Sequence, residues 1–274
     1  MFDIAPDKLT QYAESTAKCL DSDCVVRGKR ITGRISLFLK RLTEAAEKCR
    51  MELADSTAPR AVAEWLADNR FLAEKEARSA AAAFKGAGML PAASEDRIPL
   101  VCAAASAFVH ACGCKVDRES LMTFFEGFQK IRPFSEKELS LLFDSIRYAL
   151  VEKVVECGQR AFSVQDDAGD PAFIASAVFS SLRYIDDADA DEILRGLSQT
   201  ERRFLEDPAD VYGKMDKESR RRYRMRLSDL AGDYQLSERA AAEQILALAG
   251  KENGIRSHIG YWLFEKPLGH EGKN

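Results

Sequence analysis

The run from Ser135 to Val154 narrows the choice of folds more than any other part of the chain. Ser135 followed three residues later by Glu138 forms a capping box, a pattern with which α-helices begin. Apolar residues then recur at the spacing of one helix face: Leu139, Leu142, Phe143, Ile146, Leu150 and Val154. A stripe of this length has to be buried against other elements, so the sequence predicts a long helix in a packed helical core.

Helical patterns also cover most of the remaining chain, which has only eight prolines and no stretch with the alternation of a half-buried strand. Residues 86–99 are predicted to form a loop. The other predicted helices cover residues 6–20, 30–55, 59–85, 100–112, 118–131, 171–185, 190–206, 216–234, 237–249 and 255–265. We therefore expect an all-α fold, a multi-helix bundle or array of about ten helices packed as two halves.

The clearest candidate for a boundary between the halves is the polar stretch SVQDDAGD, residues 163–170. It separates a predicted N-terminal helical subdomain, residues 1–163, from a C-terminal one, residues 164–274. A chain of 274 residues is long enough for either one large domain or two smaller ones.

Charge and composition exclude several classes of protein. The net charge is −4, from 40 Lys and Arg against 44 Asp and Glu, whereas duplex-binding domains are strongly basic. No apolar run approaches the roughly 18–20 residues that span a bilayer. The seven cysteines are scattered and odd in number, and the first residues do not resemble a signal peptide. We expect a cytoplasmic chain without a membrane span, with free thiols and no nucleic-acid partner.

The series DDADADE offers the most plausible metal ligands, because Asp187, Asp189 and Asp191 have a spacing that can hold a divalent cation. An EF-hand loop would need Gly and Glu where this chain has Glu192 and Ser198. We interpret the series instead as the acidic first turn of the helix that follows.

A second candidate is HACGC, which places His110, Cys112 and Cys114 close together, but no matching second pair of ligands follows. The chain also lacks a Gly-rich phosphate loop and a recognisable nucleophile motif. The sequence therefore predicts no metal, no cofactor and no catalytic residue.

Residues 217–226 hold six basic side chains against one acidic side chain. If Asp216 caps a helix here, Tyr223, Leu227, Leu230 and Tyr234 form its apolar stripe and Arg220 and Arg224 border that stripe. Arg221, Arg222 and Arg226 would lie further towards solvent. We expect arginine stems to pack on the core while their guanidinium groups pair with nearby carboxylates.

The segment that contains this run, DPADVYGKMDKESRRRYR, resembles a signature of cyclic β-1,2-glucan synthases, membrane enzymes of glycosyltransferase family 84. The similarity extends to HIGYWLF and to WLADNRFLAEKEAR, so three ordered segments match over residues 58–264. The matching residues are Trp65, Leu66, Asp68, Asn69, Glu74, Asp207, Pro208, Val211, Tyr212, Met215, Asp216, Arg220, Tyr223, Arg224, His258, Gly260, Tyr261 and Leu263.

The chain departs from the family pattern at four positions of this signature. Asp210 stands where the family has Gly or Ser, Lys217 replaces Phe, Ser219 replaces Thr, and Arg221 occupies a position that is often acidic. Of the matching residues, Asn69 lies on the apolar face of its predicted helix, so its amide is expected to bond a backbone group or an Arg.

In that family, such a helical region precedes membrane spans, a transferase domain that uses UDP-glucose, and a phosphorylase-like domain. No position here matches the family's catalytic residues. The resemblance implies a non-catalytic cytoplasmic region, an excised part or a short relative, that packs against the transferase module at the inner face of the membrane. Most motif residues would then be structural, and Tyr212 and Tyr261 could present ring faces to glucan.

The alternative is an independent helical adaptor that binds a protein or an acidic partner through Arg220–Arg226. Sequence alone leaves both hypotheses open.

Overall fold

The all-α prediction is confirmed. The structure, a computed structural model, describes residues 4–20, 24–54, 60–93, 97–160 and 171–269, although the side chains of some residues within these ranges are not described. The chain forms two compact units. Unit 1 comprises Met1–Arg132 and Leu141–Ala190, and unit 2 comprises Pro133–Ser140 and Asp191–Asn274.

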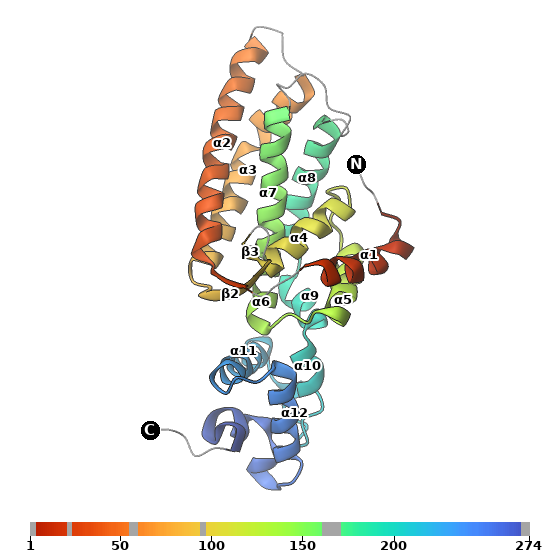
Figure 1. The fold of residues 1–274 in the computed structure, drawn as a ribbon, viewed down its shortest axis with the longest axis vertical. Helices are drawn as coiled ribbons and strands as arrows, with labels where there is room; N and C mark the ends of the chain where they lie inside the picture. Colours follow the sequence, from red (N-terminus) through yellow and green to blue (C-terminus); the bar gives the residue numbers. More distant parts are fainter. Residues whose placement is uncertain (1–3, 21–23, 55–59, 94–96, 161–170, 270–274) are drawn as a thin grey trace. The chain divides into compact units, whose positions relative to one another are not determined.

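Unit 1 is built around long helices that run side by side, α2, α3, α7 and α8 (Figure 1). A shorter pair, α1 and α5, packs together beside α4. The bounds are α1 Pro6–Cys19, α2 Lys29–Ala54, α3 Arg60–Lys85, α4 Leu100–Ala111, α5 Arg118–Ile131, α7 Leu142–Arg160 and α8 Pro171–Asp187.

A small antiparallel sheet in unit 1 corrects one prediction. Its strands are β1 (Cys24–Arg27), β2 (Met89–Ala93) and β3 (Ile98–Pro99), in the order β1-β2-β3, with Val26 opposite Leu90. The prediction of a loop over residues 86–99 is therefore wrong for β2 and β3. These strands are too short to show alternation, and β2 pairs with β1, which lies far away in the sequence, so local patterns do not reveal the sheet.

An aromatic cluster forms the core between the shorter helices. The ring of Phe124 lies 5.0 Å from that of Phe125 and 5.4 Å from that of Phe108, measured between centroids, and all three side chains are fully buried. Gly127 brings α1 close to α5, because an added Cβ would lie 3.1 Å from the carbonyl oxygen of Thr10. Such close-packed contacts leave little space for relaxation after a substitution.

Unit 2 contains shorter elements around a core that includes Phe204, Tyr212, Leu227, Ile245 and Trp262. Its elements are α6 Glu136–Ser140, α9 Ala190–Leu197, which begins one residue before the unit boundary, α10 Gln199–Phe204, η1 Tyr212–Lys214, α11 Lys217–Asp233, α12 Glu238–Ala249, η2 Gly254–Ser257, η3 Tyr261–Glu265, which is a π-helical turn, and η4 Pro267–Gly269.

The predicted helix from Ser135 to Val154 has the expected capping box, in which the amide of Ser135 donates to Glu138 Oε2 at 2.9 Å. It is nevertheless split at Leu141, so α6 belongs to unit 2 and α7 to unit 1. Its apolar stripe is buried on both sides of the break, which explains why periodicity alone predicts a single helix.

Two further predicted helices are also divided. The helix over 190–206 is interrupted at Ser198, whose Oγ accepts a hydrogen bond from the amide of Glu201 and caps α10. The helix over 255–265 consists of two short turns, η2 and η3. The predicted boundary at 163–164 lies outside the described residues, and the chain passes from unit 1 to unit 2 between Ala190 and Asp191. Among the described residues, no helix has the combined length and apolarity that crossing a membrane requires.

Phe124→Ala should lower the free energy of unfolding by about 4 kcal/mol, because it leaves a cavity among close-packed rings. Ile131→Ala, in the same helix, is a matched control, since Ile131 is 42% exposed and its loss should cost less than about 0.5 kcal/mol. Urea denaturation followed by circular dichroism measures both. Equal losses would contradict the placement of Phe124 in the core.

Candidate functional site

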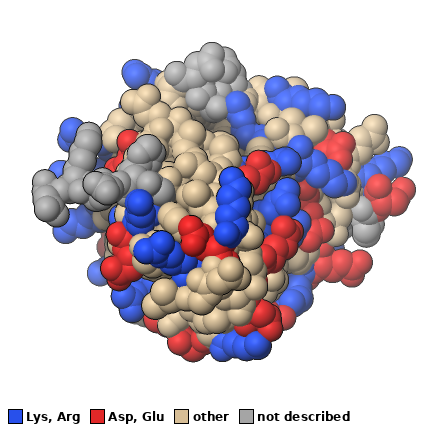
Figure 2. Space-filling view, turned by 90° about the horizontal axis from the view of Figure 1, so that it is seen from below, with Lys and Arg blue, Asp and Glu red and all other residues tan. Residues whose placement is uncertain are grey.

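Three of the six basic side chains of residues 217–226 turn inward. Arg220 and Arg224 have side chains that are only 14% and 6% exposed, and Arg226 Nε donates to the carbonyl oxygen of Leu263 at 3.2 Å. Lys217, Arg221 and Arg222 remain exposed. Figure 2 shows that Lys and Arg side chains lie among Asp and Glu side chains over the face in view. The six basic side chains of the run therefore do not all lie on one exposed face.

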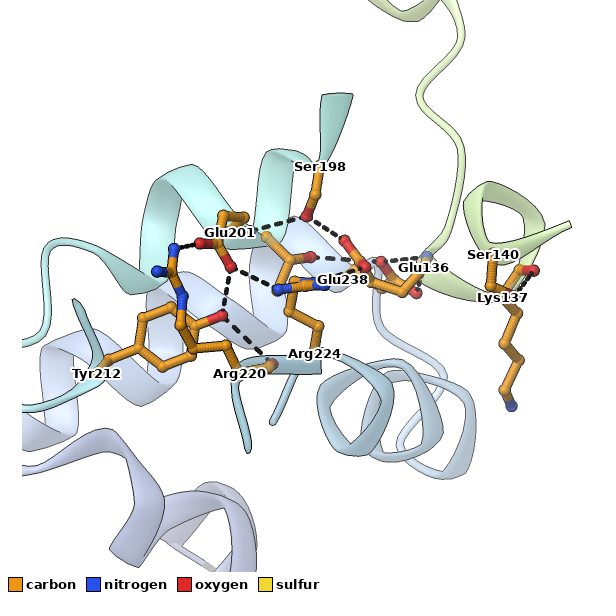
Figure 3. A network of polar contacts seen from close by, with 10 residues as sticks. Glu136, Lys137, Ser140, Ser198, Glu201, Tyr212, Arg220, Arg224 and Glu238 are labelled. Atoms are coloured by element: carbon orange, nitrogen blue, oxygen red, sulfur yellow. Dashed lines mark hydrogen bonds and ion pairs between the residues drawn. The ribbon is translucent and has the colours of Figure 1, made fainter. Parts of the chain in front are cut away.

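The two inward arginines belong to a buried polar network in unit 2, the Glu201 cluster, drawn in Figure 3. Arg224 Nη1 donates to Glu201 Oε2 at 2.6 Å and Arg224 Nε donates to Glu136 Oε2 at 3.2 Å. Arg220 forms an ion pair with the other oxygen of Glu201. The cluster comprises Glu136, Ser198, Glu201, Tyr212, Arg220, Arg224 and Glu238.

Tyr212 and Ser198 complete the hydrogen bonds of the cluster. Tyr212 Oη donates to Glu201 Oε2 at 2.6 Å, and Ser198 Oγ donates to Glu136 Oε1. The guanidinium of Arg220 lies over the Tyr212 ring, 5.4 Å from its centroid. Burial raises the pKa of Tyr212 to about 12, so this phenol stays protonated and acts as a donor.

Glu238, at the start of α12, links the cluster to α6. Both of its carboxylate oxygens accept from the backbone amide of Glu136 at 3.0 Å, which satisfies a free amide at the start of α6. Burial raises the pKa of Glu238 to about 7 and also raises the pKa of Glu136, where a bond from Ser198 and the charge of Arg224 oppose it.

The second network, the Asp207 clasp, joins the loop after α10 to the segment before η3. Asp207 Oδ2 accepts from the amides of Val211 and Tyr212, each at 3.1 Å, and Oδ1 accepts from the amide of Ile259 at 3.1 Å. The Nδ1 atom of His258 lies 2.8 Å from Oδ2. Burial alone would raise the pKa of Asp207, but the bonds from His258 and from these amides outweigh burial and lower it.

The clasp continues from His258 Nε2 to Tyr223 Oη, at 3.1 Å. Gly260 is required for this contact, because an added Cβ would lie 2.5 Å from Tyr223 Oη and 2.7 Å from His258 Nε2. The order carboxylate, imidazole, hydroxyl is also that of a nucleophile triad. However, burial and the charge of Asp207 raise the pKa of Tyr223, opposite to the activation of a nucleophile. The arrangement is chemically suited to holding two segments together.

The structure thus brings the motif residues of the C-terminal half together in unit 2. Asp216 caps α11 by accepting from the amide of Ser219 at 2.9 Å, and Met215 packs on the core. Pro208 and Val211 are exposed, whereas Tyr261 is half-buried.

The other five matching residues, Trp65, Leu66, Asp68, Asn69 and Glu74, lie in α3 of unit 1. Asp68 is exposed, and Asn69 Oδ1 accepts from Arg183 Nη2 at 2.5 Å. The side chain of Trp65 lies outside the described residues.

The remaining candidates from the sequence show no ligand geometry. Asp191 and Glu192 occupy the first turn of α9, as expected, whereas Asp187 is the last residue of α8, so the interpretation of the series as one acidic first turn is wrong for Asp187. Burial raises the pKa of Cys102 to about 12 and that of Cys114 to about 11, so both thiols stay protonated. Within the described ranges, no group of three or more His, Cys, Asp or Glu side chains could hold a metal ion.

Sequence reasoning missed Glu136, Ser198 and Glu201. A usable signal was present, since Ser198 and Glu201 have the spacing of a capping box inside a predicted continuous helix. Nothing local indicates that Glu201 would face Arg224, because that contact joins residues 23 positions apart.

Comparison with known proteins gives no relative, since none of the protein-family models and none of the curated proteins matches the chain.

Arg224→Ala should lower the free energy of unfolding by about 3–5 kcal/mol, because it leaves the buried carboxylates of Glu136 and Glu201 without this partner. Arg221→Ala removes an exposed arginine of the same helix and should change the free energy of unfolding by less than about 0.5 kcal/mol. Thermal or urea denaturation distinguishes the two variants. A near-neutral Arg224→Ala would show that the cluster is not a buried network.

Glu238 predicts a dependence of stability on pH. Its pKa is about 7 in the folded chain, against about 4.3 for an unperturbed Glu. Between these values the folded chain holds a proton that the unfolded chain has lost, so the free energy of unfolding falls as pH rises through this window. This group contributes a fall of about 4 kcal/mol.

Urea denaturation at a series of pH values tests this expectation. Glu238→Gln keeps an oxygen that accepts from the Glu136 amide but cannot titrate, so it should remove this fall. An equally steep fall in Glu238→Gln would assign the effect to another group, such as Glu136.

Proposed function

We propose that this chain is a non-catalytic helical region of a β-1,2-glucan synthase-like membrane glycosyltransferase. Its role there is to pack against the transferase module, while the parent enzyme transfers glucose from UDP-glucose to β-1,2-glucan. The proposal includes a cytoplasmic location at the inner face of the membrane and places the chain in carbohydrate biosynthesis.

The observation that carries the proposal is the use of the motif residues for internal contacts. Asp207 and His258 form the clasp, while Tyr212, Arg220 and Arg224 form the Glu201 cluster. A shared fold has to retain the residues that close its interior, so these are the positions at which a resemblance to a helical region is most informative.

The departure at Asp210 also fits the resemblance. Asp210 has a φ of +51°, in the left-handed region that glycine adopts most easily and that Asn and Asp tolerate better than other residues. The family has Gly or Ser at this position. A turn with the same left-handed conformation explains both the Gly of the family and the Asp of this chain. Asp210 is exposed and pairs with Lys214 at 2.6 Å.

A packing role needs a surface for the partner. Apolar side chains beside the motif segments are exposed, among them Ile255 (79%), Leu205 (53%) and Val211 (41%). Single exposed apolar residues are common on soluble proteins. Their position next to the clasp and the cluster makes them the candidates for contact with the transferase module.

A direct contact with glucan would fall on Tyr261. Tyr212 is fully buried, so its ring cannot face a sugar. Tyr261 is half-buried, with its ring edge-on to Trp262 at 5.1 Å and with the guanidinium of Arg256 at 5.6 Å from its centroid. The adaptor alternative has one observation in its favour, the exposed guanidinium groups of Arg221 and Arg222.

The proposal is tested by incubating the tagged chain with membranes of its source cells. We expect a polypeptide with transferase activity to co-purify, detected as incorporation of radiolabelled glucose from UDP-glucose into β-1,2-glucan. Ile255→Asp with Leu205→Asp should reduce the recovered activity by about tenfold or more. Arg221→Glu with Arg222→Glu should leave it unchanged.

Circular dichroism checks that both double variants remain folded. Loss of the captured partner in the arginine variant alone would favour the adaptor alternative. Recovery of no glucan-forming activity by the unaltered chain would contradict the proposal.

A further inference from the structure

Unit 2 contains a cavity of about 640 Å³ beside the Glu201 cluster. Its walls come from residues 133–138, from α10, α11 and α12, and from the turn between the last two helices. Cavities of this size hold small-molecule ligands in other proteins. None of the contacts proposed above uses it.

The cavity is lined by both polar and apolar groups. Glu238, Thr200 and Ser228 contribute a carboxylate and two hydroxyl groups, whereas Phe134, Ala231 and Leu236 contribute apolar surface. A ligand that fills it therefore needs a polar end and an apolar body.

The charged side chains that line the cavity determine which polar group the ligand should carry. Glu238 accepts from the Glu136 amide and from Thr200 Oγ1, at 3.5 Å, but no Lys or Arg among the described residues pairs with it. The cations that also line the cavity have carboxylate partners of their own. Lys137 pairs with Asp229 at 2.9 Å, Arg239 with Glu243 at 2.9 Å, and Arg203 with Glu206 at 3.5 Å.

Two other carboxylates, those of Glu136 and Glu138, act on Glu238. Glu136 pairs with Arg224, and the neighbouring Glu201 pairs with Arg220 and Arg224. Burial raises the pKa of Glu238, and the charges of Glu136 and Glu138 raise it further. A cation beside Glu238 would offset this repulsion and favour the ionised carboxylate.

We propose that this cavity binds a small molecule that carries a primary ammonium group on an apolar body, with the ammonium on Glu238 and the hydroxyls of Thr200 and Ser228. The charged groups around Glu238 are Glu136, Lys137 and Glu138 from α6, Glu201 and Arg203 from α10, Arg224 and Asp229 from α11, and Arg239 and Glu243 from α12. This inference does not depend on the role in glucan synthesis.

Three probes of similar shape test the choice of charge, with binding to the whole chain followed by amide NMR. Benzylamine should shift the amides of residues 134–138 and 228–242 and bind at least about tenfold more tightly than benzyl alcohol. Benzoate should bind more weakly still. Equal or tighter binding of benzoate, or no shift with benzylamine at millimolar concentration, would overturn the proposal.

The dependence on pH tests the role of Glu238. Benzylamine keeps its charge below about pH 8, so its affinity should rise as Glu238 loses its proton between about pH 5.5 and 7.5. Glu238→Gln should weaken binding by about tenfold or more and remove this rise. Unchanged affinity in the folded variant would overturn the proposal.

Gly232→Phe tests the location without altering any charge. Gly232 lines the cavity, and an added Cβ there meets no atom within 4 Å, so the variant should fold. A large side chain at this position should narrow the cavity and weaken benzylamine binding. Undiminished binding would show that the amine binds elsewhere and would overturn the proposal even if Glu238→Gln failed to fold.

Discussion

Unit 2 depends on the buried ion pairs that the guanidinium group of Arg224 forms. This group donates to Glu201 in α10 and to Glu136 in α6, so one buried cation in α11 joins three elements. Taking such charges out of water costs several kcal/mol per ion, which only close pairing and additional hydrogen bonds offset. The carboxylates of Glu136 and Glu201 therefore have few alternative positions, and the helices that carry them are fixed with them.

Tyr212 connects this cluster to the Asp207 clasp. Its backbone amide donates to Asp207, while its hydroxyl donates to Glu201, and the side chain is fully buried. The clasp and the cluster thus share one residue, placed on the short turn η1. The loop between α10 and α11 is therefore fixed in its middle, by the bonds of Tyr212 to Asp207 and to Glu201.

Most of the fold could be predicted from the sequence, because helical periodicity and capping are local. The capping box of Ser135 and Glu138 and the Asp216 cap of α11 formed as their patterns indicated. Periodicity could not reveal the break at Leu141, since the apolar stripe continues through it. The pairing of β1 with β2 and the contact of Arg224 with Glu136 were also inaccessible, because each joins residues far apart in the sequence.

The site was predictable only in part, for the same reason. Helical phase placed Arg220 and Arg224 beside the apolar stripe and predicted that arginines of this run would pair with carboxylates. It could not identify Glu136 and Glu201 as those carboxylates. Helical phase also could not show that residue 260 has to be Gly, because the side chains of Tyr223 and His258 meet where a Cβ would lie.

The membership of Pro133–Ser140 in unit 2 has a consequence for biosynthesis. These residues leave the ribosome before Leu141–Ala190, which belong to unit 1, and well before α10, α11 and α12. Until those helices emerge, Glu136 has neither Arg224 nor Ser198 within reach and remains hydrated. Unit 2 can therefore fold completely only after its last helices have been synthesised. By that time every residue of unit 1 has already left the ribosome.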